Sequence, residues 1–297
     1  MKKNNIQLFA KIALFGAALI WGSSFFVMKN AVDAIPTFYL LAFRFIVGCF
    51  ILSGIFYKKL KKINQDYIIK GAIIGLFLFL AYSIQTIGLI YTTPGKNAFL
   101  TALYCVIVPF LFWAVNRTRP DIYNFSAAIL CITGIGLVSL TQNLSISIGD
   151  FLTLVCSFFY AAHLVCVAKF SKNNDPIIFT ILQFAFAGGF ALIAAFFFEQ
   201  FPTHIDSGCI NELIYLAVFS TAIALLLQNI GQKYTNPSAA SIILSLESVF
   251  GVLFSILFYG ETVNGRLILG FLFIFVAILV SETKLSFLKK NKKINNI

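Results

Sequence analysis

Long runs of apolar residues alternate with short polar breaks along almost the whole chain. A window of about 19 residues finds ten such runs, each of roughly 18–22 residues and therefore long enough to cross about 30 Å of hydrocarbon as a helix. The predicted helices lie near residues 8–28, 37–57, 67–90, 97–115, 122–141, 150–169, 177–198, 211–231, 238–258 and 264–283. The pattern predicts an all-α integral membrane protein with ten transmembrane helices.

Part of this pattern occurs twice. Gln85–Pro94 reads QTIGLIYTTP, and Gln228–Pro237, 143 positions later, reads QNIGQKYTNP, with six identical residues in ten. The two copies begin in the third and eighth predicted helices, five crossings apart, and an odd number of crossings reverses the direction of the chain. We therefore expect a 5+5 inverted-topology repeat whose halves are residues 1–143 and 144–297.

Weaker correspondences extend the repeat. Trp21 corresponds to Tyr160, and Gly134 corresponds to Ala277. Inverted repeats are the commonest architecture for alternating access, with the substrate site near the bilayer midplane between the halves. The repeat therefore indicates a carrier.

Composition agrees with a membrane protein, because charged residues make up 11% of the chain whereas soluble domains have about 25%. The net charge of +11 does not indicate a nucleic-acid partner, since the charges are placed as topology signals. With a cytoplasmic N-terminus, 18 of the 22 Lys and Arg residues lie on the cytoplasmic side. Lys29, Lys96 and Arg266 lie outside, and Arg44 lies within the membrane. We expect both termini to be cytoplasmic and the protein to reside in the cell membrane.

Two charged residues lie inside predicted helices, where a charge is costly and suggests function. Glu247 is close to the midplane and is a candidate for binding substrate or coupling to protons, or alternatively ties its helix to a neighbour. Arg44 either faces the cavity, where it could hold a carboxylate through two hydrogen bonds, or snorkels or forms a structural pair. If both face the cavity, they complement a zwitterion.

Uncharged polar and aromatic residues inside the helices complete the candidate substrate site. Each of them also has a structural explanation, because hydroxylated and small residues mediate close helix packing in membranes. The candidates are Trp21, Tyr82, Gln85, Asn97, Thr101, Tyr104, Tyr160, His163, Gln228, Ser241 and Ser245.

With these residues in view, the chain resembles the EamA-type transporters of the drug/metabolite transporter superfamily. The resemblance is carried by the runs AALIWGSSF (residues 17–25), FRF (43–45), YTTPGKNAFLTALYCVIVP (91–109) and the segment 245–282 with its Leu246-Glu247 and Gly260-Glu261 pairs. The family often has Pro directly after the ninth-helix Glu, where this chain has Ser248. The resemblance implies a metabolite carrier, commonly an exporter of amino acids or related compounds.

Other functions fit the sequence less well. A membrane enzyme is not expected, because the Asp residues lie in loops or at a helix end and no nucleophile motif is present. No cofactor motif is present. The nearest alternative is an importer, or an antiporter of sugar phosphates or nucleotide sugars. Carriers of such multiply charged substrates should have several intramembrane cations rather than Arg44 alone. A channel or scramblase remains a further alternative, and the oligomeric state is open.

Two local features predict departures from regular helices. The duplicated segments leave their helices at opposite faces of the membrane, so we expect them to form paired gate elements, with Gln85 and Gln228 just inside each mouth. Pro109 lies inside the fourth predicted helix and predicts a kink there, because it cannot bond to the carbonyl of Cys105.

Overall fold

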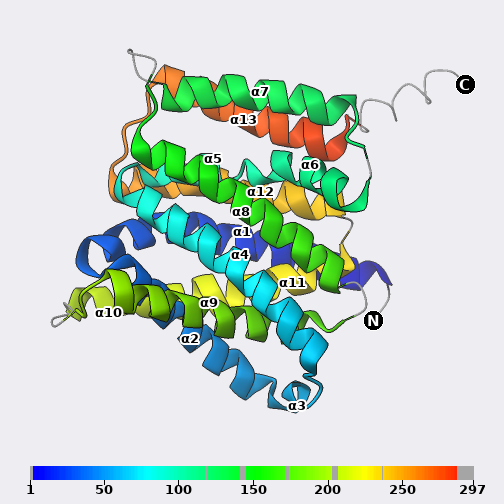
Figure 1. Cartoon of the computed structure of the whole chain (residues 1–297). Helices are drawn as coiled ribbons and strands as arrows, with labels where there is room; N and C mark the ends of the chain where they lie inside the picture. Colours follow the sequence, from blue (N-terminus) through cyan, green and yellow to red (C-terminus); the bar gives the residue numbers. More distant parts are fainter. Residues whose placement is uncertain are drawn as a thin grey trace, which may run out of the picture.

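The chain folds into a bundle of long, roughly parallel and antiparallel helices (Figure 1). The computed structural model describes residues 3–117, 119–140, 145–171, 174–202, 207–235 and 237–285. The helices of the first half are α1 (Lys3–Ala34), α2 (Thr37–Ile55), α3 (Tyr57–Leu60), α4 (Gln65–Ile90), α5 (Pro94–Thr101), α6 (Tyr104–Asn116) and α7 (Ile122–Ser139). Those of the second half are α8 (Ile148–Ser171), α9 (Pro176–Phe198), α10 (Ser207–Ile214), η1 (Tyr215–Ile223), α11 (Ala224–Tyr234), α12 (Pro237–Phe254), η2 (Ser255–Tyr259) and α13 (Gly265–Thr283).

These helices form the ten predicted crossings. Among the described residues, nine helical segments are long and apolar enough to span a membrane. Two of these combine consecutive elements, α5 with α6 and α10 with η1 and α11. The tenth crossing is α12 continued by η2. The chain is an all-α membrane protein built as a 5+5 repeat, and the expected boundary at residues 143–144 lies outside the described residues.

Backbone features repeat at the shift of 143 seen in the sequence. Arg117 and Gly260 both have left-handed conformations, with φ of 59° and 73°. Four residues later, Asp121 and Asn264 accept hydrogen bonds from the first turns of α7 and α13 as N-caps. The connection between the last two crossings therefore begins and ends alike in each half.

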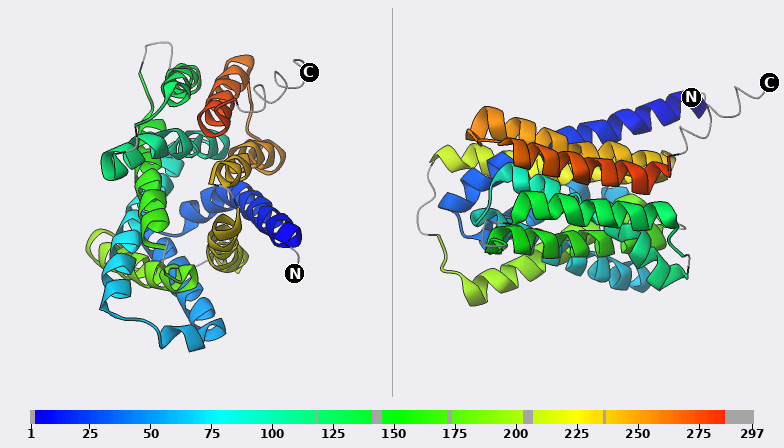
Figure 2. Two further views of the ribbon diagram at one scale, coloured as in Figure 1. Left: turned by 90° about the vertical axis from the view of Figure 1, so that its right-hand side faces the viewer. Right: turned by 90° about the horizontal axis from the view of Figure 1, so that it is seen from above.

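The helix packing is unchanged when the halves are exchanged. In the second half α8 packs along α4, α5 and α6; in the first half α1 packs along α11 and α12 in the corresponding way. The pairs α2–α9 and α7–α13 each join a helix to its own counterpart. Figure 2 shows this arrangement end-on, with α7 and α13 set at one edge of the bundle. Helices that pack on their own counterparts must lie beside the pseudo-two-fold axis.

The ends of the crossings define two faces of the bundle. Helix α1 begins and α13 ends at the same face (Figure 1), as an even number of crossings requires; we name it the terminal face and the other the opposite face. Phe196 and Phe198, near the end of α9, are both 79% exposed. Such side chains suit lipid rather than water, in agreement with a membrane-embedded perimeter.

Two irregularities differ from the sequence-based expectation. The fourth crossing is interrupted at Ala102–Leu103, where the Leu103 amide bonds to the Leu100 carbonyl, and Pro109 lies within α6. The eighth crossing contains the π-helix η1, which no feature of the sequence indicated. Both irregularities lie close to the central cavity described next.

Candidate functional site

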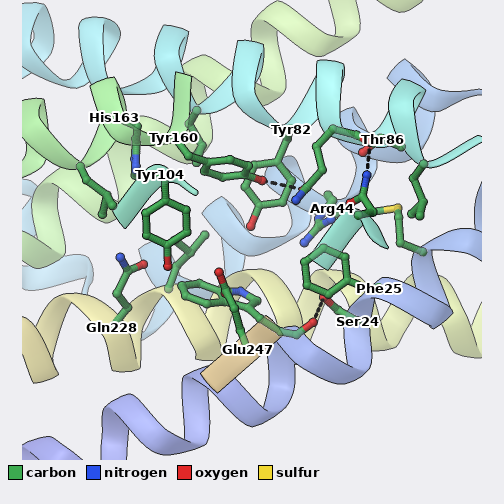
Figure 3. A pocket seen from close by; sticks show the side chains of 18 residues that line it. Ser24, Phe25, Arg44, Tyr82, Thr86, Tyr104, Tyr160, His163, Gln228 and Glu247 are labelled. Atoms are coloured by element: carbon green, nitrogen blue, oxygen red, sulfur yellow. Dashed lines mark hydrogen bonds between the residues drawn. The ribbon is translucent and has the colours of Figure 1, made fainter. Parts of the chain in front are cut away.

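A narrow cavity lies in the middle of the bundle, where helices of both halves meet (Figure 3). Its free volume is about 60 Å³, which is enough for a few water molecules because each needs roughly 10–15 Å³ on this measure. Most of the residues predicted for a substrate site line it: Trp21, Arg44, Tyr82, Gln85, Asn97, Tyr104, Tyr160, His163, Gln228 and Glu247.

Arg44 contributes a fully buried guanidinium to this cavity from α2. Its side chain is 1% exposed, so it does not snorkel to the surface. Nε donates to Thr221 Oγ1 at 2.8 Å and Nη2 donates to Ser220 Oγ at 3.0 Å. The guanidinium also lies 4.7 Å from the centre of the Tyr82 ring, a cation–π contact. Among the described residues, no carboxylate lies within ion-pair distance of Arg44.

The π-helix η1 supplies both hydroxyls that hold Arg44. Thr221 Oγ1 donates to the carbonyl of Leu216 five residues earlier, at 2.8 Å, and the Trp21 indole N–H donates to the Ser220 carbonyl at 2.9 Å. A π-helix displaces backbone carbonyls from the regular i→i−4 pattern and is frequent at functional sites. The π-helix η1 therefore holds both the Arg44 guanidinium and the Trp21 indole.

Three tyrosines form an aromatic wall beside Arg44. The rings of Tyr82 and Tyr160 meet edge to face with centres 5.4 Å apart, and Tyr104 lies 6.3 Å from Tyr160. The Tyr160 hydroxyl donates to Gln85 Oε1 at 2.7 Å, while Gln85 Nε2 donates to Thr101 Oγ1 at 2.9 Å. Because both ends of its amide are bonded, Gln85 fixes the wall in place.

Glu247 places a carboxyl group in the same cavity. It is 5% exposed and interacts with Tyr104, the residue 143 positions earlier in the first half. A residue can touch its own counterpart only close to the symmetry axis. The cavity therefore lies on the pseudo-two-fold axis between the two halves.

The remaining candidates differ in what they contact. His163 bonds to Gln183 through Nε2 at 2.8 Å, and Figure 3 shows it at the end of the cavity away from Arg44. Asn97 Nδ2 donates to Thr153 Oγ1 at 2.8 Å. Gln228 lines the same cavity as Glu247 and Tyr104 (Figure 3). His163 and Asn97 therefore both line the cavity and bond to a neighbouring helix.

Two candidates do not line the cavity in the described structure, and a third cannot be placed. Thr101 is buried behind Gln85, and Ser245 is fully buried within the helix packing. The side chain of Ser241 lies outside the part of the structure that is described. The structure thus gives no support to a direct site role for Thr101 and Ser245, and that of Ser241 stays a prediction.

The cavity also has lining residues that the sequence analysis missed. They are Ser24, Phe25, Met28, Leu78, Thr86, Leu89, Leu164 and Leu225. A helical signal was present for several, since Ser24, Phe25 and Met28 follow Trp21 at spacings of three, four and seven. Ser220 and Thr221 do not line the cavity but bond to Arg44, and the sequence analysis missed them as well.

A second, wider space lies between the central cavity and the terminal face. This vestibule has a volume of about 660 Å³ and lies between the terminal-face halves of α6, α8 and α11. Tyr104 and Leu164 line both spaces. These two side chains therefore lie where the vestibule and the cavity meet.

Comparison with known proteins shows which family the chain matches. Residues 8–140 and 147–283 each match the EamA-like transporter family. An uncharacterized transporter of Archaeoglobus fulgidus is 33% identical over 278 residues, covering 92% of this chain and 86% of the relative. The uncharacterized transporter YyaM of Bacillus subtilis is 25% identical over 310 residues, covering 99% and 98%.

A solved crystal structure shares the fold. It superposes with a TM-score of 0.65 at 15% identity, covering 92% of this chain and 96% of the other. Two tandem family matches, relatives along nearly the full length and a cavity on the repeat axis agree with one another. The chain belongs to the EamA-like transporter family and is a multi-pass membrane transporter.

Proposed function

We propose that this transporter carries a small organic metabolite with a carboxylate, most simply an amino acid or a related compound, and exports it. The observation that carries the proposal is Arg44, a buried guanidinium facing the cavity with no carboxylate partner among the described residues. An uncompensated charge inside a membrane protein is costly. A substrate carboxylate would supply the missing counter-charge through two parallel hydrogen bonds.

Glu247 supplies the second half of the proposed recognition. Its carboxyl group lines the same cavity as Arg44, so a zwitterion could place its carboxylate on Arg44 and its amino group on Glu247. The same carboxyl group is our candidate for proton coupling, since it can take up a proton when the substrate leaves. Trp21 and the tyrosine wall offer an apolar surface for the substrate side chain.

The repeat suggests how the substrate crosses. We infer alternating access in which the two halves, residues 1–143 and 144–297, rock around the axis through the cavity. The placement of Lys and Arg favours cytoplasmic termini in the cell membrane, so the vestibule at the terminal face opens to the cytoplasm. The cavity of about 60 Å³ must widen to load a metabolite, and Tyr104 and Leu164 are the side chains that must move.

Two alternatives make different demands on this cavity. Sugar phosphates and nucleotide sugars carry multiple negative charges, whereas Arg44 is the single Lys or Arg among the described residues that line the cavity. A channel or scramblase needs a continuous path, whereas the central cavity has a free volume of about 60 Å³. Both features favour a carrier of one carboxylate.

Uptake into inverted membrane vesicles tests this proposal. Vesicles from cells that produce the protein are given labelled amino acids and other carboxylates, with and without a pH gradient. We expect saturable accumulation of at least one amino acid above that of vesicles with Arg44→Gln. If phosphorylated sugars accumulate and no amino acid does, the proposed substrate class is wrong.

A further inference from the structure

The turn between α4 and α5 at the opposite face is held by charged side chains from three other parts of the chain. Lys29 reaches it from α1, Asp150 from the start of α8 and Glu261 from the segment before α13. The held residues, 89–96, contain the end of the first duplicated segment. This is the turn expected from the sequence to act as a gate.

Glu261 makes the densest of these contacts. Its carboxylate accepts hydrogen bonds from the Thr93 hydroxyl, from the Ser255 hydroxyl and, at 2.9 Å, from the backbone N–H of Gly95. An anion at the first turn of a helix also suits the dipole of α5. A Cβ atom on Gly95 would lie 2.6 Å from Glu261 Oε2, so the absence of a side chain there permits the contact.

Asp150 binds the same turn from the other side. It is fully buried, accepts a hydrogen bond from Thr92 and lies 3.5 Å from Lys96 Nζ. Two carboxylates, both from the second half of the chain, therefore hold one short turn of the first half. Opening this face requires that these contacts break together.

Lys29 closes the same face from α1. Its ammonium donates to the carbonyl oxygens of Leu89 and Ile90, at 2.8 Å each. These are among the last carbonyls of α4, which have no partner within their own helix. A cation at a helix C-terminus is favourable as well, so Lys29 fastens α1 to the end of α4.

The three charged side chains that hold this turn are not repeated at the corresponding positions of the other copy. The residue 143 before Glu261 is Thr118. At the shift of 139 that relates Trp21 to Tyr160, Asp150 corresponds to Lys11 and Lys29 corresponds to Ala168. The charge pattern is therefore absent from the copy, and the vestibule of about 660 Å³ opens at that face.

We propose that Lys29, Asp150 and Glu261 form a one-sided lock that keeps the opposite face closed in the empty carrier, so that substrate is captured from the terminal face. The assignment of this capture to export rests on the proposed function and on cytoplasmic termini; the lock itself does not. These residues set the side of capture without touching substrate.

Reciprocal accessibility measurements test the lock. In a background with the six native cysteines replaced by Ala, Leu89→Cys reports the opposite face and Val108→Cys reports the vestibule. The reagent is a maleimide–polyethylene glycol too large to pass the cavity, applied in detergent so that it reaches both faces. Each reporter is combined with Glu261→Gln and, independently, with Asp150→Asn in case one variant does not fold.

We expect either substitution to speed labelling at Leu89→Cys about tenfold or more, the factor for one charge-assisted hydrogen bond, and to slow labelling at Val108→Cys. The matched control is Asp66→Asn, which removes an exposed ion pair with Lys70 on α4 and should change neither rate. Faster labelling at both reporters would mean general loosening and would overturn the lock, as would unchanged rates. No substrate is needed, so the outcome is independent of the proposed function.

Discussion

Arg44 is the residue on which the proposed substrate recognition depends. The sequence placed a cation in the second helix but left open whether it snorkels, because the position along a helix does not give the direction of the side chain. The structure resolves this through contacts that are distant in sequence, with Thr221 and Ser220. Those contacts hold the guanidinium at the cavity.

The first prediction concerns the charge of Arg44. Replacing it with Gln should weaken substrate binding about 10- to 100-fold, because a hydrogen bond to a charged group contributes about 1.5–3 kcal/mol. Replacing it with Lys should recover part of this loss, since an ammonium keeps the charge but not the planar fork. Binding of a transported amino acid to purified protein is the measurement.

Arg266→Gln is the matched control. Arg266 is exposed and donates to the Leu140 carbonyl away from the cavity. It should bind substrate as the unchanged protein does. If Arg44→Gln and Arg266→Gln bind the amino acid with equal affinity, Arg44 does not take part in substrate binding.

A second prediction separates two roles of Glu247. If it couples transport to protons, Glu247→Gln should abolish accumulation driven by a pH gradient and retain exchange of labelled for unlabelled substrate. Transport in proteoliposomes with and without the gradient distinguishes these activities. If Glu247→Gln still accumulates substrate when a pH gradient is applied, Glu247 does not couple transport to protons.

At the scale of helices, the positions of the crossings could be predicted because each is a continuous apolar run. The irregular segments could not. The break at Ala102–Leu103 was not predicted, and it lies seven residues before Pro109, the one residue of this crossing that suggested a kink. The π-helix η1 depends on contacts with Trp21 and Arg44, which have no local signature.

The third prediction tests η1 as the support of Arg44. Combining Ser220→Ala with Thr221→Val removes both hydroxyl acceptors of the guanidinium and should raise the apparent KM for the carboxylate substrate. The physical reason is that Arg44 loses its fixed direction while keeping its charge. Ser83→Ala is the control, because the buried Ser83 hydroxyl has no hydrogen-bond partner among the described residues. If both changes leave KM unaltered, η1 does not position Arg44.

The fourth prediction concerns the contact between α7 and α13. A Cβ atom at Gly134 would lie 2.7 Å from Ile274 Cγ1 and 2.9 Å from the Gly270 carbonyl oxygen. Gly134→Ala should therefore destabilise the protein by about 1–3 kcal/mol, as overpacking does, and lower its Tm in detergent.

Gly189→Ala in α9 meets no atom within 4 Å and serves as the comparison. Its Tm should stay close to that of the unchanged protein. Equal Tm values for the two variants would show that the close approach of α7 and α13 does not contribute to stability.

At the scale of the whole molecule, the duplicated segment was the most informative feature of the sequence. It predicted the five-plus-five architecture, and the left-handed residues Arg117 and Gly260 at the same shift show the copies in the backbone. The sequence did not indicate that the two faces differ. That asymmetry depends on Lys29, Asp150 and Glu261, which come together only in the folded chain.

Counterflow in proteoliposomes tests the central claim, a carrier that alternates around the Arg44 cavity, most directly. Vesicles loaded with an unlabelled amino acid that the protein transports are diluted into a trace of the labelled compound. The account predicts transient accumulation of label that saturates with external concentration and is lost with Arg44→Gln but not with Arg266→Gln. Uptake that rises linearly with concentration, shows no stimulation by internal substrate and persists in Arg44→Gln would contradict it.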